Sequence, residues 1–339
     1  MPKTRTARLI SLSDSDGLHL SRRRLLTAWA TVFAAGSLVP FFRLARQGAL
    51  TSIRTSRPML GTWVQVIVRS RDRGRAERAT RAAFAAFADV DRRMSIHRAD
   101  SELARVNADA GRRVRPVSSA VLAVVERSLE LSRQSGGIYD PTVLPLMHLY
   151  GFYGPARDRF PTDREIAACL ERTGSSKVTL DRAAGTLGLA SAGAGLDLGS
   201  LGKGWAVDRA VDALRAHGIT SGLVDAGGKV YGLGVPEEGV EGWSVGLRHP
   251  VSGRLERVFV LRNQAVGTSG NNERYRDIGG VRVGHLLDAR RGRPTNEHLT
   301  ASVQAATCLE ADALCTVAFL LGPDRFRHFP GALLTHYLG

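Results

Sequence analysis

Asp312 and Thr316 are four residues apart, a spacing that places both side chains on one face of a helix. Magnesium prefers carboxylate and other oxygen ligands, and phosphate oxygens of a substrate often complete its shell. The pair therefore predicts half of a magnesium site. The spacing is not sufficient by itself, because Asp and Thr in this arrangement more often cap a helix or face solvent.

A glycine-rich run from Asp197 to Gly204 could hold an anion. It contains Gly199, Gly202 and Lys203, and it joins a strand-like segment to a helical one. Main-chain N–H groups at the start of a helix attract phosphate, and glycine lets a ligand approach the backbone closely. Lys203 adds a positive charge at the same place. An ordinary strand-to-helix turn has a similar composition, so the run alone leaves both interpretations open.

His285 ends a strand-like run just before a charged loop. The ordinary pKa of histidine lies near neutrality, so a side chain in this position could give or take a proton. A single histidine is more often structural. We therefore treat His285 as a candidate acid–base group whose role depends on its neighbours.

Other familiar site motifs do not fit the spacing. A P-loop would need glycine in place of Asp197 and Ser or Thr in place of Gly204, and a dinucleotide-binding run would need glycine in place of Leu198. No H-E-x-x-H, EF-hand or G-x-S-x-G motif is present, which excludes the usual zinc-protease, calcium and α/β-hydrolase sites. The three cysteines form no C-x-x-C pair, so neither a disulfide framework nor a zinc site is predicted.

The segments that must position these residues mix helical and strand-like patterns. A strand is predicted at 63–68, and apolar spacing predicts helices at 75–93, 121–135, 164–173, 203–217 and 308–321. Short strand-like runs separated by glycine lie at 186–189, 222–224, 230–233, 244–247, 257–261, 265–268 and 281–287. This succession predicts an α+β fold, a single domain of mixed helices and mostly antiparallel strands.

The net charge of +15 is concentrated at the N-terminus. Residues 1–58 carry ten basic and two acidic side chains, which accounts for +8 and leaves +7 for the rest of the chain. The remaining arginines alternate with apolar residues instead of clustering beside aromatic ones. That pattern is typical of solvated helix faces, so we expect no nucleic-acid partner.

The N-terminus has the features of an export signal. Arg22, Arg23 and Arg24 precede an apolar run at 25–39, which is shorter than the roughly 20 residues of a membrane-spanning helix. An arginine pair before such a run is typical of a twin-arginine signal. We predict a signal segment and linker at 1–47 and a periplasmic or other extracytoplasmic location. If the signal is not cleaved, it would tether the protein to a membrane.

Several motifs, in order over about residues 57–333, resemble those of the ApbE family of FAD:protein FMN transferases. They are Met59-Leu60-Gly61-Thr62, Met94-Ser95-Ile96-His97, Asp100-Ser101-Glu102, Tyr139-Asp140-Pro141-Thr142, the run 196–204, Ala226-Gly227-Gly228, Thr268-Ser269-Gly270, His285 and Ala311-Asp312-Ala313-Leu314-Cys315-Thr316. The resemblance implies a flavin transferase domain at 50–339. The chain departs from the family pattern at His97, where Tyr is common, at Lys229, where an acid is usual, and at Ala289-Arg290-Arg291.

The resemblance also assigns roles to residues. It implies FAD contacts by Leu60, His97, Ile138, Tyr139, Asp140, Asp197, Lys203 and Leu286. It implies a Mg²⁺ site from Ser200, Asp312, Cys315 and Thr316, with Ser200 and Cys315 binding through main-chain oxygens. His285 matches the catalytic histidine of the family, and we add the hypothesis that Asp288 orients it.

The activity implied is magnesium-dependent transfer of FMN from FAD, through a phosphodiester bond, to a Thr or Ser of an acceptor flavoprotein, with release of AMP. A FAD-binding accessory protein and a FAD pyrophosphatase are the alternatives. The twin-arginine leader resembles the NosX branch of nitrous-oxide reductase maturation, whose acceptor is a NosR-like membrane protein. The general branch instead serves membrane electron-transfer subunits.

Overall fold

The computed structural model describes residues 10–11, 50–271, 274–295 and 298–338. The predicted signal segment, 1–47, lies outside the described residues except for β1 (Ile10–Ser11), which pairs in parallel with β9. Within the described parts of the chain, no helix has both the length and the apolar character needed to cross a membrane.

A seven-stranded sheet is the centre of the fold, and all of its strands are antiparallel to their neighbours. Across the sheet the order is β17 (Leu334–Leu338), β16 (Thr300–Ala305), β11 (Gln264–Gly270), β8 (Lys229–Leu233), β7 (Ser221–Ala226), β3 (Thr62–Ser70) and β2 (Thr51–Met59). The prediction of an α+β fold with mostly antiparallel strands is confirmed.

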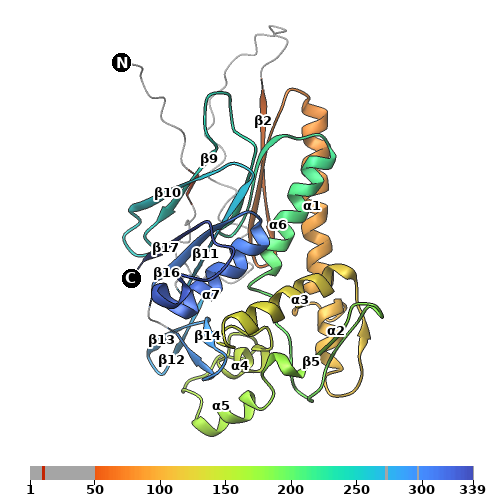
Figure 1. Cartoon of the computed structure of the whole chain (residues 1–339), viewed down its shortest axis with the longest axis vertical. Coiled ribbons are helices and arrows are strands. Elements are labelled where there is room, and N and C mark those ends of the chain that lie inside the picture. Colours follow the sequence, from red (N-terminus) through yellow and green to blue (C-terminus); the bar gives the residue numbers. More distant parts are fainter. Residues whose placement is uncertain (1–9, 12–49, 272–273, 296–297, 339) are drawn as a thin grey trace.

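Three long helices cover one face of this sheet (Figure 1). They are α1 (Arg73–Met94), α6 (Gly202–Ala216) and α7 (Cys308–Phe326). The other face is covered by β9 (Trp243–Arg248) and β10 (Leu255–Leu261). Successive side chains of β3 point to opposite faces of the sheet. Val64, Val66 and Val68 join the core under the helices, whereas Ile67 joins the core under β9 and β10.

The remaining elements form the lower part of the molecule in Figure 1. The helices there are α2 (Glu102–Ala108), α3 (Ser119–Gln134), α4 (Leu144–Leu149) and α5 (Asp163–Leu170). The short strands are β4 (Arg115–Pro116), β5 (Val178–Asp181), β6 (Thr186–Leu189), β12 (Tyr275–Ile278), β13 (Val281–Gly284), β14 (Leu287–Asp288) and β15 (Arg293–Pro294).

Two sequence interpretations need correction. The first strand is predicted only at 63–68, but β2 (Thr51–Met59) precedes it and pairs with β3 along its whole length. Its burial pattern is that of an edge strand with little apolar surface, so hydrophobic periodicity could not reveal it. The run at 281–287 is not one strand, because His285 and Leu286 lie between the end of β13 and the start of β14.

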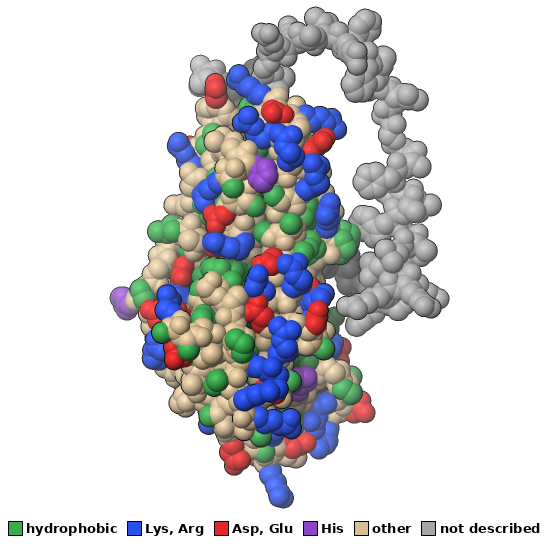
Figure 2. All heavy atoms as spheres, turned by 90° about the vertical axis from the view of Figure 1, so that its right-hand side faces the viewer, with side chains coloured by type: hydrophobic (Ala, Val, Ile, Leu, Met, Phe, Trp, Pro, Cys, Tyr) green, Lys and Arg blue, Asp and Glu red, His purple; other side chains and the backbone are tan. Residues whose placement is uncertain are grey.

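The outer face of α1 carries charge of both signs. Lys and Arg side chains are spread along this side of the molecule with Asp and Glu between them (Figure 2). On α1, Arg73 pairs with Glu77, and Arg93 pairs with Asp89. The arginine-rich helix is therefore a solvated face stabilised by pairs one helical turn apart.

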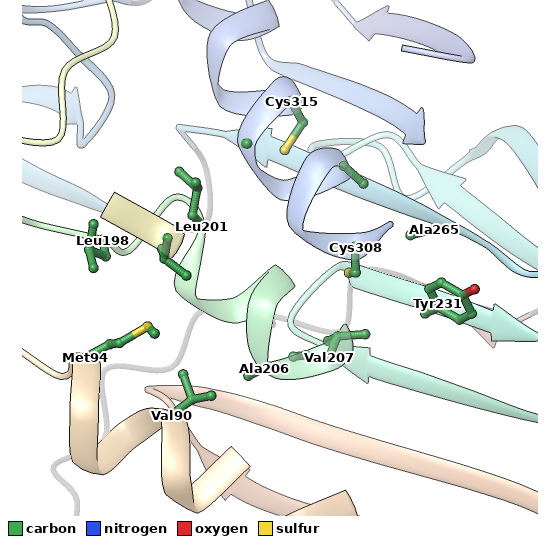
Figure 3. Packing of buried hydrophobic residues seen from close by; sticks show 14 of the residues in the cluster. Val90, Met94, Leu198, Leu201, Ala206, Val207, Tyr231, Ala265, Cys308 and Cys315 are labelled. Atoms are coloured by element: carbon green, nitrogen blue, oxygen red, sulfur yellow. The ribbon is translucent and has the colours of Figure 1, made fainter. Parts of the chain in front are cut away.

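Helices α6 and α7 approach each other closely. The Asp208 carboxylate of α6 accepts hydrogen bonds from the N–H groups of Cys308 and Leu309, 2.8 and 2.9 Å away, at the start of α7. One turn earlier, the Gly204 N–H donates to Asp312 Oδ2 at 2.8 Å. Figure 3 shows side chains of α6 packed between those of α1 and α7. The position of Asp312 therefore depends on the absence of a side chain at residue 204.

We predict that Gly204→Ala lowers the free energy of unfolding by about 1–3 kcal/mol, the usual cost of overpacking. A Cβ there would collide with the Cys308 carbonyl and lie 2.7 Å from Asp312 Cβ. Gly202→Ala is the matched control, since a Cβ at residue 202 meets no atom within 4 Å. Denaturant unfolding of both variants gives the comparison, and equal stabilities would contradict the proposed crowding.

Candidate active site

Asp312 and Thr316 lie on the same buried face of α7, as their spacing predicts. Oδ2 of Asp312 accepts the Gly204 N–H, whereas Oδ1 is buried and accepts no hydrogen bond from the described residues. The Thr316 hydroxyl lies 3.1 Å from Ser269 Oγ and 3.3 Å from the Asp312 carbonyl oxygen. A buried carboxylate oxygen without a donor, beside two hydroxyl groups, is a set of acceptors that suits a hard cation.

No group of three or more His, Cys, Asp and Glu side chains among the described residues could hold a metal ion by itself. A cation beside Asp312 would therefore need hydroxyl, main-chain, water or substrate oxygens. Mg²⁺ commonly binds in this way, through one or two carboxylates and the phosphates of its substrate. The residues present fit that mode of binding.

The four residues predicted to bind magnesium have different surroundings. The Cys315 thiol lies 3.0 Å from Ser269 Oγ and 3.2 Å from the Asp312 carbonyl oxygen. Burial raises the pKa of Cys315, so its sulfur is a neutral thiol and not a thiolate ligand. Ser200 lies in the loop before α6, with Oγ 3.0 Å from the Tyr139 hydroxyl.

Tyr139 lies close to the glycine-rich run, and the charge of Asp312 on α7 also reaches it. Burial raises its pKa, and the carboxylates of Asp140, Asp197 and Asp312 raise it further. The phenol therefore stays protonated within electrostatic range of both the glycine-rich run and α7.

Lys229, the first residue of β8, places a positive charge inside this cluster. Its side chain is buried, and Nζ lies 3.5 Å from Asp312 Oδ1 and 3.7 Å from Cys315 Sγ. The ammonium group also donates to the Thr268 carbonyl oxygen on the neighbouring strand β11. The sequence marks Lys229 as a departure from the family pattern, and the structure places it beside the predicted metal ligand.

The glycine-rich run forms the turn into α6. Asp197 holds the turn, since Oδ1 accepts the Gly199 N–H at 2.8 Å and Oδ2 accepts the Tyr153 hydroxyl at 2.6 Å. Lys203 lies in the first turn of α6 and donates to the Gly199 carbonyl oxygen at 2.7 Å. The first N–H groups of this helix are partly used already, since Gly202 donates to the Leu198 carbonyl oxygen at 2.7 Å and Gly204 donates to Asp312 Oδ2 at 2.8 Å. The Lys203 ammonium group is therefore the feature of this turn that attracts an anion.

His285 is held by the main chain. Its Nδ1 lies 3.1 Å from the Arg274 carbonyl oxygen. A carbonyl can only accept, so the proton is on Nδ1 and the lone pair of Nε2 is available as a base. Burial lowers the pKa of His285 to about 3, and the positive charges of Arg274, Lys203 and Lys229 act in the same direction. The imidazole is therefore neutral at physiological pH.

Asp288 does not orient His285, contrary to the sequence hypothesis. Its carboxylate receives the Arg290 guanidinium at 2.9 and 3.1 Å and the Arg290 N–H at 2.9 Å. Burial acts to raise the pKa of Asp288, but these hydrogen bonds outweigh it, so the pKa is lowered. The Arg274 carbonyl is the orienting group, and no sequence pattern could reveal a main-chain contact across eleven residues.

The side chains predicted to contact FAD are not equally available. His97 is exposed and lies edge-on to Tyr153, with ring centroids 5.2 Å apart. Asp140, in contrast, is buried and accepts hydrogen bonds from Ser132 Oγ and from the Ser175 N–H, both at 2.8 Å. Asp140 therefore stabilises its own turn, and only that turn's backbone could face a ligand.

Three apolar residues, Leu60, Ile138 and Leu286, are predicted to contact FAD, and the structure describes their main chain. Leu60 has a φ of 51°, which the tight hairpin between β2 and β3 imposes. The Ile138 carbonyl accepts the Ala289 N–H at 3.0 Å, and the Leu286 carbonyl accepts the Thr295 N–H at 2.9 Å. The first bond ties the 138–140 turn to the segment that follows His285, and the second closes that segment on itself.

Sequence reasoning missed two residues beside this site. The Arg274 guanidinium lies over the Tyr153 ring, 4.6 Å from its centroid, and the Tyr153 hydroxyl binds Asp197. Burial raises the pKa of Tyr153, so the phenol remains a donor. Neither residue belongs to a recognisable motif, and only the folded arrangement brings them together.

The geometry can be compared with known proteins. The model of the ApbE family matches residues 60–333. The FAD:protein FMN transferase of Vibrio cholerae is 34% identical over 241 residues, which cover 70% of this chain and 71% of that protein. The FAD:protein FMN transferase of Treponema pallidum is 32% identical over 293 residues, which cover 80% and 81%.

Solved structures show the same fold. The flavin transferase ApbE from Vibrio cholerae superposes with a TM-score of 0.74 and 28% identity, over 86% of this chain and 98% of that one. The ApbE protein of Thermotoga maritima gives a TM-score of 0.78 and 27% identity, over 85% and 94%. The apo form of the Pseudomonas stutzeri flavinyl transferase ApbE gives a TM-score of 0.73 and 28% identity, over 85% and 95%.

The lowered pKa of His285 predicts a pH dependence of stability. Because the folded-state pKa is about 3 and the ordinary value is 6.5, the unfolded chain binds more protons between these values. The contribution is complete at neutral pH and is lost as pH falls below about 6.5, by on the order of 1–2 kcal/mol at pH 5. Urea unfolding at pH 7 and pH 5 should show a smaller loss for His285→Gln. The exposed His328 provides the control, and a His285→Gln slope equal to that of His328→Gln would refute the assignment.

Proposed function

The chain belongs to the ApbE family, and we propose that it is a FAD:protein FMN transferase that depends on magnesium and releases AMP. One observation carries the proposal. Asp312 Oδ1, which accepts no hydrogen bond from the described residues, lies 3.5 Å from Lys229 Nζ, and the charges of Lys229 and Lys203 both act on the neutral imidazole of His285. An acceptor for a cation, a fixed cation and a base are the groups that phosphoryl transfer from a diphosphate requires.

Asp312 and Thr316 would hold Mg²⁺ through a carboxylate and a hydroxyl oxygen. The ion would neutralise charge on the diphosphate and on the departing AMP. Lys203, at the start of α6, would provide a second positive charge. The backbone of the 138–140 turn and of Leu286 would line the flavin side.

His285 is the proposed base. Nε2 would take the proton from a Thr or Ser hydroxyl of the acceptor protein as that oxygen attacks the phosphorus on the FMN side. A new P–O bond forms, the bond from that phosphorus to the AMP oxygen breaks, and AMP leaves. A bound diphosphate would raise the low pKa of His285, because its negative charge favours the imidazolium form. The free protein would then hold a weak base that strengthens when substrate binds.

Transfer should give an acceptor that gains the mass of FMN and an equal amount of AMP, measured by mass spectrometry and chromatography. His285→Ala should reduce transfer by roughly 10²–10⁴-fold while FAD still binds, since a general base contributes that much. Asp312→Asn should also abolish transfer, whereas Asp324→Asn, at an exposed residue beyond the break in α7 at Gly322, should not.

The alternatives give different products. AMP and free FMN without labelled acceptor would identify a FAD pyrophosphatase, and bound FAD with no AMP would identify an accessory protein. Full transfer by His285→Ala would contradict the role of this histidine.

We also propose that the protein is exported and acts on a membrane flavoprotein outside the cytoplasm. Support comes from Arg22 and Arg23 before a short apolar run. The acceptor would be a NosR-like protein or a subunit of an electron-transfer complex.

Replacing Arg22 and Arg23 by lysine should retain the folded protein in the cytoplasm of a host with a twin-arginine pathway. Cell fractionation of both forms checks this, with Lys177→Gln as a control substitution in the folded domain. Equal periplasmic amounts of the double variant and the parent would contradict the route.

A further inference from the structure

Lys229 is a buried cation beside the proposed metal ligand. Only 4% of the residue is exposed, and its Nζ lies 3.5 Å from Asp312 Oδ1. That distance exceeds an ordinary N–H···O hydrogen bond, so the ammonium group compensates the carboxylate without using its oxygen. The direct acceptor of Lys229 is the Thr268 carbonyl oxygen. The strands β8 and β11 therefore fix a positive charge next to Asp312.

A second lysine acts on the same region. Lys203 Nζ is held 2.7 Å from the Gly199 carbonyl oxygen at the start of α6, and its charge, like that of Lys229, lowers the pKa of His285. The charge of Asp312 is already balanced by Lys229. A dication that arrives alone would meet a compensated carboxylate and a further ammonium group, and would gain little attraction from them.

A bound diphosphate would increase the attraction between this site and a dication. Its negative charges attract both lysines and supply phosphate oxygens as further metal ligands, which Mg²⁺ readily accepts. The Oδ1 atom of Asp312 then has a free lone pair for a cation that the substrate has already partly neutralised.

We propose that Lys229 makes divalent-metal binding conditional on the diphosphate of FAD. The protein alone holds the ion weakly, and metal and FAD strengthen each other's binding by the same factor. This inference rests on the proposed function, because it assumes that FAD and Mg²⁺ share this site. Lys229 is a positioning residue for the metal and not a catalytic one.

The test is a Mn²⁺ titration of the full chain, without FAD and with saturating FAD, followed by the electron paramagnetic resonance signal of free Mn²⁺. Chromatography confirms that FAD stays intact during the measurement. For the parent protein we expect FAD to increase Mn²⁺ affinity at least tenfold. Asp312→Asn should remove the tight binding that FAD induces and further weaken the binding without FAD.

Lys229→Gln separates charge from hydrogen bonding, because glutamine can still donate to the Thr268 carbonyl. This variant should bind Mn²⁺ at least tenfold more tightly than the parent without FAD, and FAD should then add less. Lys229→Met, which removes the donor as well, should show the same gain. Lys177→Gln removes one charge on the short helix at Ser175–Lys177 and should behave like the parent.

Three results would overturn the inference. Equal Mn²⁺ affinity of the parent with and without FAD would do so while leaving the proposed magnesium site intact, provided that Asp312→Asn still abolishes binding. Absence of Mn²⁺ binding even with FAD would overturn both the inference and the metal site. The third result concerns Lys229 itself: Lys229→Gln and Lys229→Met, both folded, that bind Mn²⁺ without FAD no more tightly than the parent would overturn its role and leave the metal site intact.

Discussion

The contact between α6 and α7 is the constraint on which the site depends. The Gly204 N–H reaches Asp312 Oδ2 only because residue 204 has no side chain, and Asp208 holds the first N–H groups of α7 one turn further along. The same helix begins at the glycine-rich turn that carries Lys203. One helix therefore sets the positions of the glycine-rich turn and of the Asp312 carboxylate together.

These two contacts affect stability as well as position. Burial raises the pKa of Asp208 to about 6, and its hydrogen bonds to the Cys308 and Leu309 N–H groups oppose that rise. A carboxylate that is costly to ionise is retained because it satisfies backbone donors that the helix cannot satisfy itself. The N-terminus of α7 is thus fixed by charge–dipole interaction, and its next two turns present Asp312 and Thr316 to the site.

The sequence predicted the parts of the site that lie within one element. The Asp312–Thr316 spacing and the glycine-rich run at Lys203 both depend on local geometry, and the helices that carry them were predicted within a few residues. Contacts between elements were not predictable. The Arg274 carbonyl oxygen accepts a hydrogen bond from His285, and the Tyr153 hydroxyl donates one to Asp197. Both Arg274 and Tyr153 lie in segments without periodic signals. The edge strand β2 was missed because its side chains are mostly exposed, so it lacks the alternation that identified β3.

Lys229 shows how one substitution can alter charge without altering the fold. Lys229 is buried at the start of β8, and a buried ammonium group requires hydrogen-bond acceptors and a counter-charge. Thr268 on β11 supplies a carbonyl oxygen, and Asp312 on α7 supplies the counter-charge. The cost of burying the lysine is offset by groups that also form the site. Stability and the charge of the site are therefore coupled at this residue, and an apolar replacement that improved packing would also change how the site receives a cation.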